Sequence, residues 1–271
     1  MKTLPVALQI YTVRDYAEKD FKGTMQAVKD MGYDYVEMAG LFGICPCEIK
    51  AVLTEIGLTP ISAHVPLNEL TSDMEGTVET YNSLGCKYIA IPYLGEGMRP
   101  GDDGFVQVLA DIKAIGAICH AKGMTLLYHN HDFEFIKLAS GEYALDNMYS
   151  SVDADLLQTE IDTCWVKVAG ECPSGYIKKY AGRCPVVHLK DFVGQKSDSM
   201  YELIGIDKKV DKTEEFAFRP VGYGVQDFPS ILETSVESGA LYVVVEQDRS
   251  DDCTSLEAAK KSREYLKTLG W

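Results

Sequence analysis

The sequence has few basic residues for its size. Its 271 residues include 26 Lys and Arg against 41 Asp and Glu, which gives a formal net charge of −15. Nucleic acids and anionic membranes attract clusters of Lys and Arg, so this balance argues against both as partners. The sequence also lacks the run of about eighteen apolar residues that a membrane helix needs. We therefore expect neither a nucleic-acid nor a membrane partner.

Export signals and metal-binding cysteine motifs are also missing. The start, MKTLPVALQIYTVR, holds an apolar stretch that Gln9 and Arg14 interrupt, and no small-residue cleavage site follows it. We expect a first strand there and no secretion signal. Among the eight cysteines, Cys45 and Cys47 form one close pair, and no second pair completes a zinc tetrad. We therefore expect free thiols and a cytoplasmic location.

The sequence does contain a regular alternation of short apolar runs and longer amphipathic stretches. The predicted strands are 6–12, 33–39, 60–65, 88–93, 125–130, 157–162, 185–191 and 242–248. The predicted helices are 20–31, 46–56, 71–84, 104–122, 143–151, 174–181, 228–238 and 255–269. Asp20, Asp227 and Ser255 are expected to cap the N-termini of three of these helices.

Strands that are apolar on both faces and alternate with helices predict a parallel sheet covered by helices. About eight such units favour a closed (β/α)8 TIM barrel, an α/β fold formed by residues 1–271 as a single domain. An open doubly wound sheet is the alternative. The long stretch 193–227 is expected to be an active-site loop or a partner-contacting excursion, with Gly222 and Gly224 allowing a tight turn near its end.

Polar side chains gather at the ends of the predicted strands, where a barrel places its functional groups. They are Glu37, His64, His129, His131, Glu134, Glu160, Asp162, His188, Lys190, Asp191, Glu246 and Asp248. Residues two apart in a strand share a face, so several of them are predicted to point into the barrel together. Such a mixture of imidazoles and carboxylates suits one divalent metal, which we expect to be Mn, Co, Zn, Fe or Mg.

Several motifs carry a family resemblance. The strand ends LQTEID, VVHLKD and VVVEQD, with LQIYTVRD near the start and GYG-x-x-DF before the last helix pair, resemble the sugar phosphate isomerase/epimerase group of xylose-isomerase-like barrels. The resemblance covers essentially the full length and implies one metal held by a Glu, an Asp, a His and a Glu. Asp162, His188 and Glu246 match three of these ligands, whereas His129 stands where the first Glu is expected.

The sequence leaves the fourth ligand open. His129 is the favoured candidate; Glu134 and Glu160 are the alternatives, in which case His129 and His131 would serve the substrate. Glu160 would lie about 6 to 7 Å deeper in the barrel than Asp162, which favours a supporting position behind a ligand. The YHNH segment is also similar to the His-rich strand end of inosose dehydratases.

The resemblance implies removal of a proton next to a substrate carbonyl that the metal polarises. Glu246 is the expected base, with His131 or His129 as the exchanging acid, and Lys190 is expected to neutralise negative charge on the substrate. The expected substrate-binding residues are Glu37, His64, Glu134, Glu160 and Trp165.

The expected function is isomerisation or epimerisation of a sugar or polyol. The alternatives are a dehydratase or lyase acting on an inosose or a 3-keto-sugar, and a non-catalytic sugar-binding barrel. A DNA-repair endonuclease is disfavoured by the negative charge and by the presence of only five histidines. Because no G-x-x-x-x-G-K phosphate loop occurs, we expect an unphosphorylated sugar. The sequence does not identify the substrate and leaves the oligomeric state open, with a homodimer as the prior expectation.

Overall fold

Eight short strands pair in parallel and close into a barrel in the order β1-β10-β7-β6-β5-β4-β3-β2. The structure is a computed structural model that describes residues 2–196 and 216–271. The barrel strands are β1 Val6–Gln9, β2 Tyr35–Ala39, β3 Thr59–His64, β4 Tyr88–Ile91, β5 Thr125–His129, β6 Gln158–Asp162, β7 Val186–Leu189 and β10 Tyr242–Val245. The predicted TIM barrel is therefore confirmed, and the open sheet is excluded.

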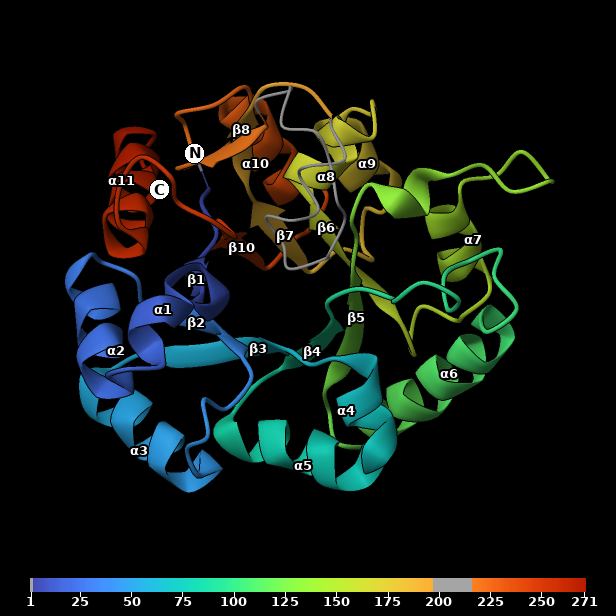
Figure 1. Cartoon of the computed structure of the whole chain (residues 1–271), viewed down its shortest axis with the longest axis horizontal. Helices are drawn as coiled ribbons and strands as arrows, with labels where there is room; N and C mark the ends of the chain where they lie inside the picture. The colour runs from blue at the N-terminus through green and yellow to red at the C-terminus, as the bar shows by residue number, and fades with distance from the viewer. Residues whose placement is uncertain (1, 197–215) are drawn as a thin grey trace.

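Helices surround the strands as an outer ring, which is visible in Figure 1. They are α1 Arg14–Ala17, α2 Phe21–Asp30, α3 Pro46–Ile56, α4 Leu67–Ser72, α5 Met74–Leu84, α6 Phe105–Ala121, α7 Ala144–Ser150, α8 Thr163–Val168, α9 Pro173–Lys179, α10 Phe228–Glu237 and α11 Ser255–Thr268. No helix among the described residues is both long and apolar enough to span a membrane.

Several predicted strands end earlier than expected, and two of them do so because another element begins. The first ends at Gln9, because residues Ile10–Val13 turn into the 3-10 helix η1. The seventh ends at Leu189, and Asp191–Val193 instead forms β8, which pairs antiparallel with β9, Ala217–Arg219. The last residue of β8 and all of β9 lie within 193–227, the stretch predicted to be an irregular excursion; residues 197–215 of that stretch lie outside the described residues.

Side-chain caps define several helix starts. Asp20 and Asp227 cap α2 and α10 as predicted. The predicted cap of α11 is wrong by one residue, since Thr254 accepts the backbone N–H of Glu257 and completes a capping box with it. Ser255 is already the first helical residue, and its hydroxyl donates to Asp15 instead. The helix therefore begins where the last extended residue offers a hydroxyl to the third helical position.

The turn at the end of the 193–227 stretch is anchored to the barrel by Asp191. The backbone N–H groups of Gly222 and Gly224 donate to its carboxylate at 3.0 and 2.8 Å. Gly222 has a φ of 90°, a conformation that a residue with a Cβ rarely adopts. The predicted tight turn is confirmed, and its anchor is a strand-end carboxylate.

The cysteine prediction fails for one pair. Cys45 and Cys47 are joined in a disulfide across the start of α3, with their Cα atoms 5.4 Å apart, a separation that a disulfide spans readily. The other six cysteines are free, as expected.

An apolar layer fills the barrel below the strand ends. It consists of Ala7, Ile61, Tyr88, Ala90, Leu127, Val186 and Val244. Because strand residues two apart share a face, the inward residues that follow this layer are polar at several strands, for example His129, His188 and Glu246. The apolar layer is thus a floor that carries a polar layer above it.

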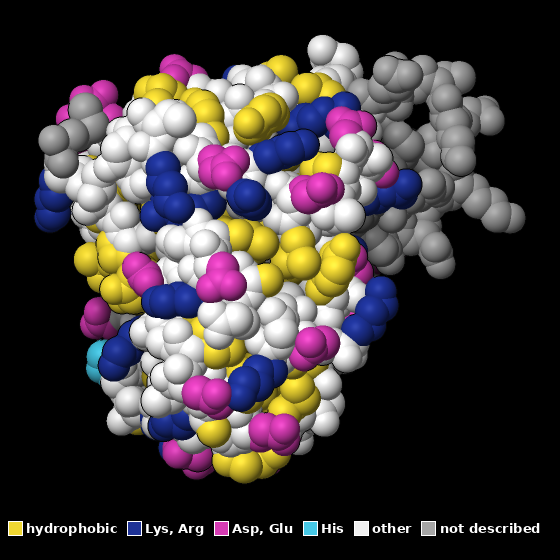
Figure 2. Space-filling view, turned by 90° about the vertical axis from the view of Figure 1, so that its left-hand side faces the viewer, with side chains coloured by type: hydrophobic (Ala, Val, Ile, Leu, Met, Phe, Trp, Pro, Cys, Tyr) yellow, Lys and Arg dark blue, Asp and Glu magenta, His cyan; other side chains and the backbone are white. Residues whose placement is uncertain are grey.

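The outer surface mixes charges of both signs. On the face that forms the left-hand side of Figure 1, acidic and basic side chains lie interspersed with apolar ones (Figure 2). The described residues of this face do not gather into a basic surface.

Candidate active site and metal centre

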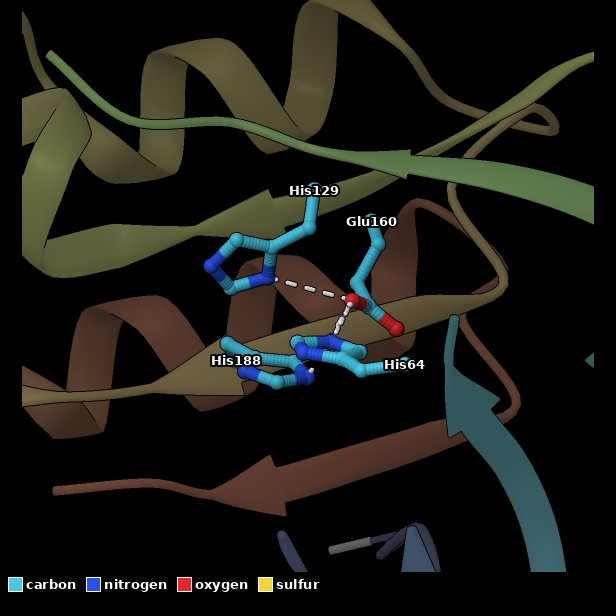
Figure 3. A group of neighbouring side chains, drawn as sticks. All are labelled: His64, His129, Glu160 and His188. Carbon is cyan, nitrogen blue, oxygen red and sulfur yellow. Dashed lines mark hydrogen bonds and ion pairs between the residues drawn. The ribbon is translucent and has the colours of Figure 1, made fainter. Parts of the chain in front are cut away.

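Three histidines from separate strands meet around one carboxylate in the polar layer. His64 ends β3, His129 ends β5 and His188 lies within β7. The centroids of the three rings are 4.6 to 5.3 Å apart. Glu160 of β6 places Oε2 2.7 Å from His64 Nε2 and 3.1 Å from His129 Nδ1 (Figure 3). Glu160 is fully buried, so these imidazoles are its main source of stabilising contacts.

His188 contacts a carboxylate with each ring nitrogen. Its Nε2 lies 2.7 Å from Glu37 Oε2, and its Nδ1 lies 3.0 Å from Glu246 Oε2. A carboxylate accepts hydrogen bonds, whereas a neutral imidazole carries only one N–H. The two contacts together therefore require one more proton than a neutral imidazole between two carboxylates supplies, and the raised pKa of His188 places it on the ring.

His129 presents a lone pair to two further carboxylates. When its Nδ1–H donates to Glu160, its Nε2 faces Asp162 Oδ2 at 3.5 Å and Glu246 Oε2 at 3.9 Å. Asp162 Oδ1 accepts the Trp165 N–H and caps α8. Asp162 Oδ2 is buried and has no hydrogen-bond partner among the described residues. This oxygen therefore faces a metal-binding type of nitrogen, and a cation between the two atoms would stabilise both lone pairs.

The four residues His129, Asp162, His188 and Glu246 form what we call the candidate metal set. One donor atom from each lies within 4.8 Å of the others, and all four residues are buried. Two nitrogens and two oxygens form a ligand field suited to first-row divalent metals. Each imidazole also has a carboxylate behind it, as metal-binding histidines commonly do. The residues present therefore fit a divalent metal.

Lys190, directly after β7, is a buried cation beside the candidate metal set. Its Nζ lies 2.7 Å from Asp248 Oδ2, 3.0 Å from Glu246 Oε2 and 3.5 Å from Asp162 Oδ2. One ammonium shared by three buried carboxylates neutralises only part of their charge. The carboxylates around Lys190 thus keep a net negative charge.

The pKa shifts at the centre favour the metal-binding form of three ligands near neutral pH and oppose it at His188. Burial raises the pKa of Asp162 to about 6, although Lys190 opposes the shift. Burial lowers the pKa of His129 to about 3, so this imidazole stays neutral. Burial alone would raise the pKa of Glu246, but the charges of Lys190 and His188 hold it well below its usual range. For His188 the surrounding carboxylates outweigh burial and raise its pKa well above the ordinary value.

A cavity of about 460 Å³ opens above the candidate metal set. Its polar wall includes His64, His129, His131, Lys190, Glu246 and Asp248. The remaining wall is lined by Tyr11, Ala39, Gly40, Pro66, Glu69, Pro92 and Tyr93. Six strand-end residues picked out in the sequence therefore share one cavity, as expected for the mouth of a barrel.

Four residues expected to contact substrate lie outside this cavity. Glu160 and Glu37 sit beneath the histidines, and Glu37 also accepts a hydrogen bond from Gln9. Glu134 is buried, and its carboxylate accepts from the Tyr128 hydroxyl and the His131 N–H. Trp165 is fully buried, with its ring 5.1 Å from that of His131. The structure therefore brings His64 to the cavity and places the other four as supports behind its walls.

Two cavity tyrosines were missed in the sequence. Tyr11 follows β1 in η1, and the guanidinium of Arg14 stacks on its ring at 3.7 Å from the centroid. Tyr93 follows β4 and lies edge-on to His131 with centroids 6.1 Å apart. Both occupy strand ends, the position that marked the other residues. Neither has a carboxylate, imidazole or ammonium group, so the pattern of charged and imidazole side chains at the strand ends did not include them.

Comparison with known proteins supports the same architecture. The family model described as Xylose isomerase-like TIM barrel matches residues 25–269. No curated protein matches the chain. A sugar phosphate isomerase/epimerase from Parabacteroides distasonis is 20% identical, with a TM-score of 0.78 and coverage of 98% of this chain and 94% of that one.

Two further solved structures are similar in fold. A xylose isomerase-like TIM barrel protein from Mycobacterium smegmatis, in complex with magnesium, is 15% identical, with a TM-score of 0.72 and coverage of 99% and 98%. A probable 3-DHS dehydratase involved in petrobactin synthesis from Bacillus anthracis is 12% identical, with a TM-score of 0.73 and coverage of 97% and 99%. At these identities the likeness concerns the fold.

Proposed function

The chain belongs to the xylose isomerase-like TIM barrel family, and from that premise we propose that it is a metal-dependent enzyme that isomerises or epimerises a sugar or polyol. The observation that carries the proposal is the buried candidate metal set, His129, Asp162, His188 and Glu246, of which His129 and Glu246 line the cavity. A divalent metal there supplies polarisation of a substrate carbonyl and stabilisation of the developing negative charge. The magnesium complex of the Mycobacterium protein supports a metal of this kind.

Glu246 is the proposed base. Its carboxylate lines the cavity and stays ionised at neutral pH, so it can take a proton from the carbon next to a substrate carbonyl. Lys190, with Nζ 3.0 Å from Glu246 Oε2, offsets negative charge that develops nearby. If Glu246→Gln binds metal and still turns over at the wild-type rate, the base is another residue.

His131 is the proposed partner in proton exchange. It lines the cavity, and burial lowers its pKa well below the usual range, so its imidazole is neutral in the free protein and carries one N–H and one lone pair. Its Nδ1 is buried and has no hydrogen-bond partner among the described residues. A substrate would therefore engage His131 through the part of the ring that lines the cavity.

The charge of the cavity supports an unphosphorylated substrate. Among the described residues that line it, Lys190 is the single Lys or Arg, and three carboxylates already hold it. A phosphate would face Glu69, Glu246 and Asp248, and no other Lys or Arg of the described lining could bind it. A neutral sugar or polyol avoids this repulsion.

A second candidate reaction is β-elimination, as in a dehydratase acting on an inosose or a 3-keto-sugar. The observation that favours it is the pairing of one carboxylate base, Glu246, with imidazoles on the same cavity wall. An elimination needs one base and one acid for the leaving hydroxyl, whereas a two-base epimerisation needs a group on each face of the carbon. The fold shared with the Bacillus dehydratase is consistent with this chemistry.

Metal analysis followed by an exchange assay tests the proposal. We expect about one equivalent of Mn, Co, Zn, Fe or Mg in the purified protein and none in the Asp162→Ala, His188→Ala double variant. Keto-sugars are then incubated with the metal-loaded protein in deuterated water. An isomerase or epimerase incorporates deuterium into a returned sugar, and a dehydratase yields an unsaturated product. Absence of metal from both proteins, even after soaking, would favour a non-catalytic sugar-binding barrel.

A further inference from the structure

We propose that Glu160 is a positioning residue that makes His129 a metal ligand, so that the two side chains act as one unit. The inference rests on the metal site proposed above and assigns part of that site's metal affinity to a residue outside the candidate metal set. The relevant contact is the 3.1 Å hydrogen bond between His129 Nδ1 and Glu160 Oε2.

The barrel itself brings the pair together. His129 and Glu160 are direct partners in the ladder between β5 and β6, so their side chains leave neighbouring strands at the same height. Both residues are buried, His129 at 2% exposure and Glu160 at 0%. A buried carboxylate this close to an imidazole has a strong preference for a hydrogen bond with it. The pairing is therefore fixed by strand register rather than by a loop.

The hydrogen bond determines which nitrogen of His129 can bind a metal. An ionised carboxylate can only accept, so the proton lies on Nδ1 and the lone pair lies on Nε2. Nε2 is the atom that faces Asp162 Oδ2 and Glu246 Oε2. Negative charge behind the ring also makes this nitrogen a stronger donor to a metal. Among the described residues, Glu160 is the one hydrogen-bond partner of His129 Nδ1.

A second imidazole holds Glu160 in place. His64 Nε2 lies 2.7 Å from the same Oε2 atom, and its ring packs edge-on to that of His129 with centroids 4.8 Å apart. The two dashed lines in Figure 3 meet at this oxygen. The other ligand histidine, His188, places Nε2 3.4 Å from this oxygen but has a closer carboxylate in Glu37 at 2.7 Å, so loss of Glu160 should affect His129 most.

Cobalt titration of two matched variants tests this role. Glu160→Gln removes the charge and allows the amide to donate to Nδ1, so we expect Co²⁺ affinity to fall by about 10- to 100-fold. Glu134→Gln is the control, since Glu134 is equally buried near the same strand end but bonds to Tyr128 and to the His131 backbone. Affinity of the control should stay within about threefold of the wild type. Equal losses in both variants would overturn the inference.

Making Glu160→Gln in a second protein that carries His129→Glu separates a positioning role from a general structural role. In the His129→Glu protein the ligand is a carboxylate, which has no tautomers, and its charge would repel Glu160. In this protein Glu160→Gln should therefore lower the Co²⁺ affinity by no more than about threefold, or should raise it. The same loss in both backgrounds would overturn the inference. Wild-type protein offers a check that needs no variant: ¹⁵N NMR of the metal-free protein should show the Nδ1–H tautomer of His129, and the Nε2–H tautomer would contradict it.

Failure of the inference and failure of the proposed metal site give different results. Wild-type protein that binds no Co²⁺ would overturn both. Binding that Asp162→Ala abolishes and Glu160→Gln leaves unchanged would keep the metal site and remove the positioning role alone.

Discussion

Besides His188, whose imidazole keeps a proton because the surrounding carboxylates raise its pKa, Asp162 is the ligand whose proton competes with a metal at ordinary pH. Its pKa of about 6, raised by burial, lies far above that of His129, about 3. Above pH 6 the carboxylate is already ionised and metal binding displaces no proton from it. Below pH 6 each bound metal must also release one proton from Asp162, so the fall in affinity should steepen by about tenfold per pH unit. Co²⁺ titrations between pH 5 and pH 7.5 measure this slope.

The Asp162→Asn variant provides the control for that slope. It removes the titrating group while it keeps the shape of the side chain and one oxygen ligand. We expect its weaker Co²⁺ affinity to keep the pH dependence due to His188 and to show no steepening below pH 6. If the variant steepens below pH 6 as the wild type does, a group other than Asp162 carries the additional competing proton.

Strand period explains which site residues could be predicted from the sequence. His129, His188 and Glu246 each follow an inward apolar residue by two positions, so their direction is set by the strand and is readable. Glu134 and Trp165 lie after the strand ends, in a 3-10 turn and in α8. There the direction depends on loop geometry and on partners such as Tyr128, which no local pattern reveals.

At the scale of elements, two helical glycines should respond oppositely to the same substitution. A Cβ on Gly116 in α6 would lie 2.2 Å from the Leu156 carbonyl oxygen, whereas on Gly175 in α9 it would meet Cys172 at an ordinary 3.5 Å. Gly116→Ala should therefore destabilise the protein by about 1–3 kcal/mol through overpacking. Gly175→Ala should stabilise it by about 0.5–1 kcal/mol, because alanine favours the helix. Urea unfolding measures both; a gain in stability from Gly116→Ala would contradict the close approach.

Elements with a local signature were predictable, and those formed by distant partners were not. The α3 prediction agrees with the structure at both ends, because Pro46 opens the helix and Gly57, with φ 78°, closes it. The β8–β9 ribbon pairs Phe192 with Phe218, 26 positions apart, and neither three-residue strand has a recognisable period. The predicted helix 71–84 corresponds to α5, which begins at Met74 because the side chain of Asp73 caps it; residues 71–72 instead end α4, a helix that was not predicted.

For the whole molecule, the metal should act as a cross-link within the barrel. The candidate metal set draws on β5, β6, β7 and the residue after β10, four strands that are contiguous in the closed sheet. Metal that binds only the folded state at a concentration 100 times its Kd stabilises that state by about 2.7 kcal/mol. For a domain of this size we expect a rise of roughly 5 to 10 °C in Tm over EDTA-treated protein. Thermal unfolding with and without Co²⁺ measures it.

The same centre should make the metal-free protein less stable than it could be. Asp162, Glu246 and Asp248 share one ammonium, that of Lys190, so removing one carboxylate relieves repulsion that the absent cation would otherwise offset. We therefore expect metal-free Asp162→Ala to have a Tm at or above that of the metal-free wild type and to show no rise with Co²⁺. A variant less stable than the metal-free wild type would mean that the Trp165 N–H cap from Asp162 outweighs the repulsion. The expected pair of results would indicate that the barrel keeps a destabilising cluster of charges because a metal uses it.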